Sequence, residues 1–267
     1  MKHMVVTHHE PPSSDVRPIS HQSTNQKVVA LATARMTASS RVLDVGAGEG
    51  YFAMLLGEHA KRAYGVSPRT MVSACDVTPS IFRYREIACD ALSDDGRLPY
   101  ADASFDLVCS LEVVEHVQNQ FLYCREILRV LKPGGTAILS TPNVLNMNSR
   151  YRMLHSGFAT LFNPLSRSSV DVVHTSGHIH PIGYYYLSYA LHHAGASDVS
   201  VTFDRFKRSS LLPLLLFLPI LLVGHAAFRL KLRRRDAIRF SENERFISQM
   251  QSWRMLTSRS IIVLARK

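Results

Sequence analysis

Two acidic residues and a histidine at helical spacing are the side chains best suited to chemistry in this sequence. Glu112, Glu115 and His116 are spaced i, i+3 and i+4, so they share one face if a helix has begun by Glu112. Further along, the run VHTSGHIHP adds His178. An imidazole can take a proton from a hydroxyl group near neutral pH, and carboxylates together with imidazoles can hold a divalent metal.

These residues support three interpretations, which the sequence leaves open. His116 or His178 acts as the base for a hydroxyl acceptor, or all four residues bind a metal ion. In the third interpretation the acids only orient the backbone and His116 is simply packed. Other histidines nearby are expected to be structural: His174, His192 and His193.

A strand, a glycine turn and a helix precede this group. The run VLDVGAGEG at 42–50 has Asp44 and then three glycines at alternate positions, and the helix-compatible run YFAMLLGEHA follows. Glycine permits a positive φ and lets a ligand with sugar, base or phosphate approach the backbone closely. The spacing differs from the G-x-G-x-x-G of dinucleotide enzymes. A NAD or NADP enzyme is still an alternative on this stretch alone.

Short apolar strands alternate with helices after this turn, which predicts an open parallel sheet. The second strand is expected at 62–68, and its end holds Ser67 where nucleotide-binding α/β folds usually carry an acid for the ribose. The third is expected at 85–92 with Asp90 near its end, and the fourth at 106–110.

Four blocks occur in the order found in class I S-adenosylmethionine (SAM) methyltransferases, and residues 41–143 resemble that family. The blocks are the glycine run, LPYADASFD, EVVEHV and LKPGG. The resemblance implies an α/β fold, a Rossmann-like seven-stranded mostly parallel sheet with helices on both faces. It implies SAM as the cofactor, with Ser67 a departure from the family's acid. The expected cofactor-binding residues are Asp44, Gly46, Ala47, Gly48, Gly50, Ser67, Asp90, Ala91 and Leu111.

The E-x-x-EH pattern with a later histidine is similar to that of ubiquinone-biosynthesis O-methyltransferases and small-RNA 2′-O-methyltransferases. In those enzymes it holds a divalent metal near the acceptor hydroxyls. The resemblance implies the same role for Glu112, Glu115, His116 and His178 if the protein is metal-dependent. The pattern also occurs in family members without a metal, so a metal is not the expected case.

Length and composition indicate one α/β domain with an appendage. With 267 residues and 46% hydrophobic content, the chain can bury a full core. We expect a flexible leader at 1–20, a SAM-binding core at 21–204, a hydrophobic helical insertion at 205–258 and a final strand at 259–267. The four cysteines form no C-x-x-C pair, which is typical of reduced thiols in a cytosolic protein.

The insertion combines an uncharged stretch with basic flanks. Residues 201–267 hold 14 Lys and Arg against four acids, which accounts for the net charge of +10. The stretch 209–228 carries no formal charge and, as a helix, reaches about 30 Å, the thickness of a bilayer core. A single crossing conflicts with two basic flanks and with a last strand that returns to the same sheet. Pro213 and Pro219 predict a broken or kinked helix.

We therefore expect residues 205–235 to attach the protein peripherally to an anionic membrane surface on its cytoplasmic face. A buried helix or a homodimer interface is the alternative. Nucleic-acid binding is not expected, because aromatic residues are sparse in the basic region.

The expected function is a SAM-dependent methyltransferase that O-methylates a small or lipid-linked acceptor at the membrane surface. An RNA 2′-O-methyltransferase is one alternative and would need the metal set. A non-catalytic SAM-fold binding protein is another, for which Ser67 is the only support.

Overall fold

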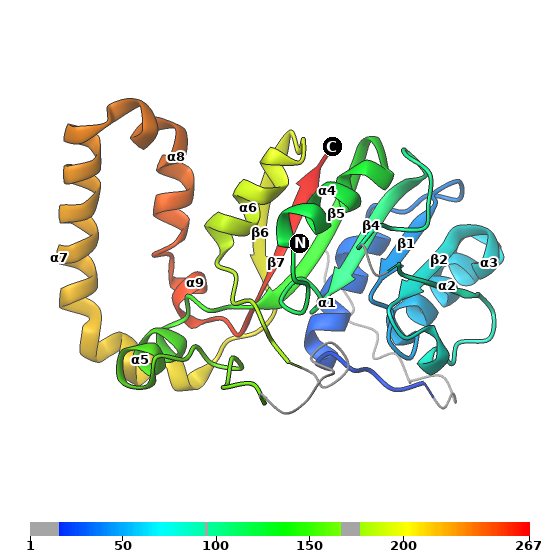
Figure 1. The fold of residues 1–267 in the computed structure, drawn as a ribbon, viewed down its shortest axis with the longest axis horizontal. Coiled ribbons are helices and arrows are strands. Elements are labelled where there is room, and N and C mark those ends of the chain that lie inside the picture. The colour runs from blue at the N-terminus through cyan, green and yellow to red at the C-terminus, as the bar shows by residue number, and fades with distance from the viewer. Residues whose placement is uncertain (1–15, 94–95, 167–176) are drawn as a thin grey trace, which may run out of the picture.

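A seven-stranded mixed sheet lies at the centre of the computed structural model, which describes residues 16–93, 96–166 and 177–267 (Figure 1). The strand order is β3-β2-β1-β4-β5-β7-β6, in which β7 pairs antiparallel with both β5 and β6 and the other pairs are parallel. The strands are β1 Val42–Val45, β2 Val72–Asp76, β3 Cys89–Ala91, β4 Phe105–Leu111, β5 Leu131–Pro142, β6 Asp198–Phe203 and β7 Ser260–Arg266. The fold is therefore the Rossmann-like α/β arrangement that the sequence predicts.

Helices cover both faces of this sheet. On one face, α1 and α2 bury Val28 and Leu56 against the strands, and on the other α4 and α6 bury Ile127 and Leu191. Each such side chain contributes about 1.5–3 kcal/mol by leaving water. The helices are α1 Gln22–Thr33, α2 Tyr51–Tyr64, α3 Pro68–Met71, α4 Gln120–Val130, α5 Met147–Ser156, α6 Tyr184–His193, α7 Leu211–Arg235, α8 Ala237–Gln249 and α9 Trp253–Thr257, with short 3₁₀ turns η1 Pro79–Ile81 and η2 Arg208–Ser210.

The second strand lies later in the chain than the sequence predicts, so the expected strand at 62–68 is wrong. Helix α2 continues to Tyr64 and ends at Gly65, whose φ of 66° gives the left-handed conformation common after a helix. Pro68 then opens α3, a position that suits proline because its missing N–H is not needed there. The strand that pairs with β1 is β2, and it ends at Asp76.

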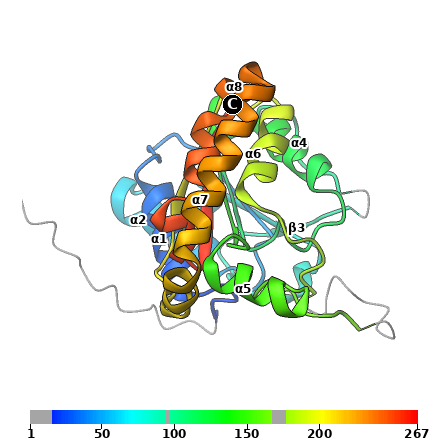
Figure 2. The ribbon, with the colours of Figure 1, turned by 90° about the vertical axis from the view of Figure 1, so that its left-hand side faces the viewer.

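Strands β7 and β6 form an antiparallel pair at the edge of the sheet. Between these two strands the chain leaves the sheet as α7 and returns as α8 and α9. Figures 1 and 2 show α7 and α8 side by side, beyond the edge of the sheet, with α5 at the base of α7. We call α7 and α8 the helical arm.

Helix α7 is one continuous element of 25 residues, not the broken helix that its prolines predict. Pro213 lies in the first turn, where no intrahelical donor is needed, and Pro219 removes one hydrogen bond without ending the helix. Among the described residues, the helical segment Arg208–Arg235 is the one long and apolar enough to cross a membrane, by length and composition alone. Only 6% of its most apolar window is buried.

Candidate functional site

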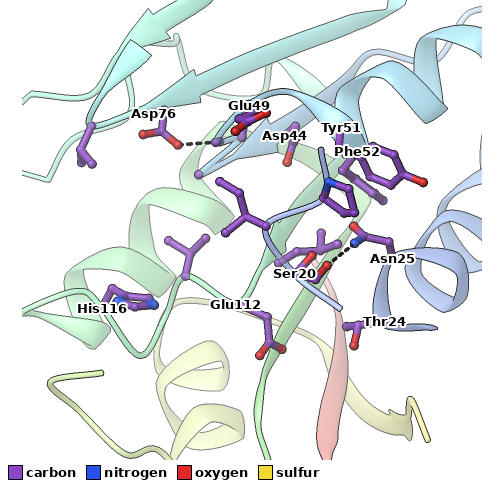
Figure 3. A pocket seen from close by; sticks show the side chains of 18 of the residues that line it. Ser20, Thr24, Asn25, Asp44, Glu49, Tyr51, Phe52, Asp76, Glu112 and His116 are labelled. Atoms are coloured by element: carbon purple, nitrogen blue, oxygen red, sulfur yellow. Dashed lines mark hydrogen bonds between the residues drawn. The ribbon is translucent and has the colours of Figure 1, made fainter. Parts of the chain in front are cut away.

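A cavity of about 930 Å³ opens at the carboxyl ends of the parallel strands, beside the point where the strand order reverses between β1 and β4 (Figure 3). Ligands of open α/β sheets bind at this switch point. The glycine loop after β1, the end of β2 and the residues that follow β4 line it, and the segment 17–25 covers it.

The glycine loop needs its glycines for steric reasons. Gly46 has φ 75°, and a Cβ atom there would lie 2.3 Å from Cγ2 of Val113. Gly48 has φ 53°, and its N–H donates a 2.8 Å hydrogen bond to Oδ2 of Asp76. Gly46, Ala47 and Gly48 line the cavity, whereas Gly50 is the residue before α2 and lies outside the lining.

Asp44 places a buried carboxyl group at the cavity wall. Its side chain is 2% exposed, and Oδ2 has no hydrogen-bond partner among the described residues. Burial, with a smaller contribution from the nearby Asp76, raises the pKa of Asp44 to about 7. A buried acceptor without a partner is costly unless a ligand supplies a donor.

We expect Asp44→Asn to stabilise the protein at pH 8. Because the pKa is raised, the folded state holds a proton between about pH 4 and pH 7 that the unfolded state has lost, so stability falls as pH rises through this window. The loss from one group is on the order of 4 kcal/mol. Asparagine does not titrate, so denaturant unfolding at pH 5 and pH 8 should show a smaller decrease for the variant.

Glu112 and Glu115 also have raised pKa values, so the wild-type protein must be measured beside the variant to separate their contribution from that of Asp44. Parallel stability curves for wild type and variant would contradict the prediction.

The acid expected at the end of the second strand is present, but at Asp76 and not at Ser67. Asp76 is buried at the cavity wall, where its Oδ1 accepts a 2.8 Å hydrogen bond from the N–H of Thr78. Ser67 is exposed before α3 and does not line the cavity. The role expected of Ser67 depends on a strand at 62–68, and the structure puts Asp76 at the end of the second strand instead. The argument for a non-catalytic protein thereby loses its only support.

The acid of the third strand, Asp90, lies outside the cavity. Asp90 and Ala91 are exposed in β3, and Asp90 accepts a 2.8 Å hydrogen bond from the Tyr100 hydroxyl. Neither residue is in the cavity lining, which Leu92 reaches instead. Leu111, at the end of β4, does line the cavity.

The residues from Glu112 to His116 form a turn, and α4 begins only at Gln120, so the condition for a shared helical face is not met. Glu112 has φ 54°, and its Oε1 accepts a 3.0 Å hydrogen bond from the Ser140 hydroxyl. Burial raises the pKa of Glu112 to about 7.

The turn brings Glu115, His116 and His178 together, with one potential ligand atom of each within 4.8 Å of the others. Glu112 is not part of this group, so three of the four expected metal-binding side chains meet. Neither carboxylate oxygen of Glu115 has a hydrogen-bond partner among the described residues. The Thr141 hydroxyl lies beside this carboxylate and also has no partner in the described part of the chain. Burial and the neighbouring Glu112 raise the pKa of Glu115.

The two histidines are held as neutral rings. Nδ1 of His116 lies 3.0 Å from the carbonyl oxygen of Gly177, so this nitrogen carries the proton and Nε2 has the lone pair. The rings of His116 and His178 meet edge to face at 4.7 Å between centroids. Burial lowers the pKa of both. His174 lies outside the described residues, and neither His192 nor His193 lines the cavity.

Several cavity residues were missed from the sequence. The leader was expected to be flexible up to residue 20, yet its described end packs over the glycine loop, where Arg17 N–H donates to the Glu49 carboxylate. No local sequence pattern predicts these contacts, because they join segments that are distant in the chain. The missed cavity residues include Arg17, Ile19, Ser20, His21, Thr24, Asn25, Glu49, Asp76, Arg205, Arg259 and Ser260.

The sheet order and the glycine loop define a Rossmann-like domain with a cavity at its switch point. Residues 43–139 match the family model described as a methyltransferase domain. A probable S-adenosylmethionine-dependent methyltransferase of Mycolicibacterium smegmatis is 36% identical over 118 residues, which cover 44% of this chain and 44% of the relative. Another, from Mycobacterium tuberculosis, is 33% identical over 123 residues, which cover 46% and 41%.

The fold extends this similarity beyond the matched segment. The crystal structure of a SAM-dependent methyltransferase from Archaeoglobus fulgidus has a TM-score of 0.52 and 15% identity, and covers 91% of this chain and 94% of that one. Residues 43–139 therefore match a methyltransferase domain and are similar to proteins described as probable SAM-dependent methyltransferases, and the fold is that of a solved SAM-dependent methyltransferase. The chain spans less than half the length of the curated relatives it matches.

Proposed function

We propose that this protein transfers a methyl group from SAM to an oxygen atom of a small or lipid-linked acceptor at a membrane surface. One observation carries the proposal. The glycine loop, the nearby acids Asp44 and Asp76, and the neutral imidazoles of His116 and His178 all line the same cavity. A transfer assay with methyl-labelled SAM and hydroxyl-bearing acceptors, including lipid extracts, tests it. Absence of SAM binding in a preceding calorimetric titration would overturn it.

The residues of the glycine-loop end fit SAM. The unpartnered Oδ2 of Asp44 suits an ammonium group, and Asp76 at the end of β2 offers acceptors to ribose hydroxyls. Gly46 and Gly48 leave room for close approach of the ligand to the backbone. When bound, SAM supplies an electrophilic methyl group, and alignment of the reactants accounts for much of the acceleration in such a displacement.

The acceptor oxygen needs a base, and His116 is the residue we assign. Its hydrogen bond to the Gly177 carbonyl fixes the tautomer and leaves Nε2 free to accept the proton. His178 packs against this ring and lines the same cavity, so it positions His116 and closes the site.

We expect His116→Gln to lower kcat by about 100-fold or more, because general-base catalysis contributes roughly 10²–10⁴. The affinity for SAM should stay within about twofold, since His116 lies away from the glycine loop (Figure 3). Single-turnover transfer and calorimetry check the two quantities. His155→Gln, on α5 outside the cavity, is a matched control.

A metal-assisted form of the same reaction is the second candidate. The meeting of Glu115, His116 and His178, together with the unpartnered carboxylate of Glu115, favours it. The test is loss of activity on chelation and its recovery with one divalent ion, with neither effect in Glu115→Gln. This result would favour the metal-assisted reaction over His116 as the general base.

The membrane part of the proposal is supported by the helical arm. Leu212, Leu215, Leu216, Ile220, Leu222 and Val223 are all 64% or more exposed on α7. Large exposed apolar surfaces mark interaction sites, and a band of basic residues at 229–235 follows this one. An anionic lipid surface satisfies both features. We therefore place the protein at the cytoplasmic face of a membrane, attached through α7.

A further inference from the structure

Two arginines face each other where the β6–β7 pair continues beyond its last regular residues. The N–H of Arg259 donates a 3.0 Å hydrogen bond to the carbonyl of Arg205, and a bridge joins Phe206 to Ser258. The same register puts Lys207 opposite Thr257, with a 2.7 Å hydrogen bond between their backbones. Side chains two residues apart along a strand lie on one face, so three cations gather there.

This cluster borders the cavity at the acceptor end. Arg205 and Arg259 line the cavity. Figure 3 shows Asp76 and Glu49 at one end and Glu112 and Thr24 at the other. The cations lie at the second end, since Arg205 shares Asp204 with Thr24.

The positive charges are incompletely balanced. Asp204, whose side chain is fully buried, accepts a 2.9 Å hydrogen bond from Arg205. Glu112 lines the same cavity and is a second acid near both arginines, and burial raises its pKa to about 7. Two acids therefore face three cations. The side chains of Arg259 and Lys207 have no hydrogen bond or ion pair among the described residues. Burial, then Arg259, Arg152 and Arg205, lower the pKa of Lys207 to about 8.

Like charges directly opposite each other in a strand pair destabilise the fold, and partial burial strengthens their repulsion. An anionic ligand would remove this cost. Guanidinium groups bind carboxylate and phosphate through paired hydrogen bonds, and a lysine adds a point charge.

We propose that Arg205, Arg259 and Lys207 form a subsite for an anionic group, a phosphate or carboxylate, on the methyl acceptor. The assignment of this anion to the acceptor depends on the proposed function, whereas anion binding does not. The subsite thus selects acceptors by charge and holds them at the end of the cavity away from Asp76.

The position of the subsite along the chain links it to the helical arm. Lys207 is followed at once by η2 and α7, so the cations lie at the root of the apolar helix. The anionic group can come from two sources, the headgroup of a lipid that α7 approaches or a soluble phosphomonoester.

The test compares Arg259→Gln with the matched control Arg254→Gln, an exposed arginine on α9 outside the cavity. Glycerol phosphate is titrated calorimetrically into the protein, with and without S-adenosylhomocysteine. In a second arm, flotation measures association with phosphatidylcholine vesicles with and without phosphatidic acid. We expect Arg259→Gln to weaken binding at least about tenfold in one arm, Arg259→Lys to weaken it less, and Arg254→Gln to stay within twofold.

Each outcome decides the proposal. A selective loss in the soluble arm or in the vesicle arm supports the subsite and identifies the source of the anion. Equal behaviour of Arg259→Gln and Arg254→Gln in both arms, or no anion binding by the wild type, overturns it. If circular dichroism shows that Arg259→Gln is unfolded, Lys207→Gln takes its place. Failure to bind S-adenosylhomocysteine would contradict the methyltransferase proposal alone, because the anion arms are also measured without it.

Discussion

Replacing Asp76 with alanine is expected to weaken SAM binding by at least about 100-fold. The carboxylate has two functions at the cavity wall. It holds the glycine loop through the N–H of Gly48 at 2.8 Å, and we propose that it accepts hydrogen bonds from the ribose hydroxyls. Hydrogen bonds to a charged group are worth about 1.5–3 kcal/mol each, and 100-fold corresponds to about 2.8 kcal/mol. Calorimetric titration of SAM measures the loss.

Ser67→Asp is the matched control, because it adds an acid at the place where the sequence alone puts the ribose ligand. Ser67 is exposed and outside the cavity lining, so this variant should bind SAM within about twofold of wild type. Tighter binding by Ser67→Asp together with little effect of Asp76→Ala would contradict the position of β2.

Charged substitutions on the exposed side of α7 should abolish association with lipid vesicles. Leu216, Ile220 and Val223 lie on one face at i, i+4 and i+7 and are 67%, 67% and 71% exposed. Each apolar side chain contributes roughly 1.5 kcal/mol or more when buried in the acyl region. Changing all three to glutamate should lower the partition coefficient more than about 100-fold in a flotation assay with anionic vesicles.

A triple glutamate variant at Phe121, Tyr186 and Tyr189 tests whether any exposed apolar group has this effect. These aromatics are exposed on α4 and α6, and we expect their variant to bind vesicles as the wild type does. If the α7 variant instead converts a dimer to a monomer, as judged by light scattering, without changing vesicle binding, the surface is a homodimer interface and the membrane proposal fails.

The fold was largely predictable because its strands are short apolar runs between strong helix and turn signals. The strand predicted at 106–110 lies within β4, and the final strand predicted at 259–267 is within one residue of β7 at each end. The second strand is misplaced because the apolar run at 62–68 favours one strand. In the structure Gly65 ends α2 and Pro68 begins α3, so this run spans two helix boundaries. Only packing against β1 distinguishes VSACD from the neighbouring runs.

The site was predictable where the chain is locally continuous and not where distant segments meet. Asp44 lies in β1 and Gly46 and Gly48 follow that strand, and the structure brings all three to the cavity together. The spacing of Glu112 and Glu115 gives a shared helical face only if a helix has begun there, but the positive φ of Glu112 begins a turn, and Glu112 is left out of the group of Glu115, His116 and His178. Arg205 and Arg259 are 54 positions apart in the sequence and meet only through strand pairing.

The bridge between Phe206 and Ser258 places the start and the end of the intervening segment at neighbouring points of the same sheet edge. A short hairpin turn at this point would join β6 to β7 in the same strand order. A long insertion is also tolerated there, because the entropic cost of closing a loop rises only slowly with its length. Helix α9 supports the core through Met255, and α8 reaches the edge of the core through the partly buried Phe246, which packs on α6. Both contacts lie far along the sheet from the switch point between β1 and β4. Insertion, loss or replacement of α7 and α8 during evolution would leave the switch point unaltered. The proposed membrane-binding arm and the methyltransferase-like sheet can therefore be inherited separately.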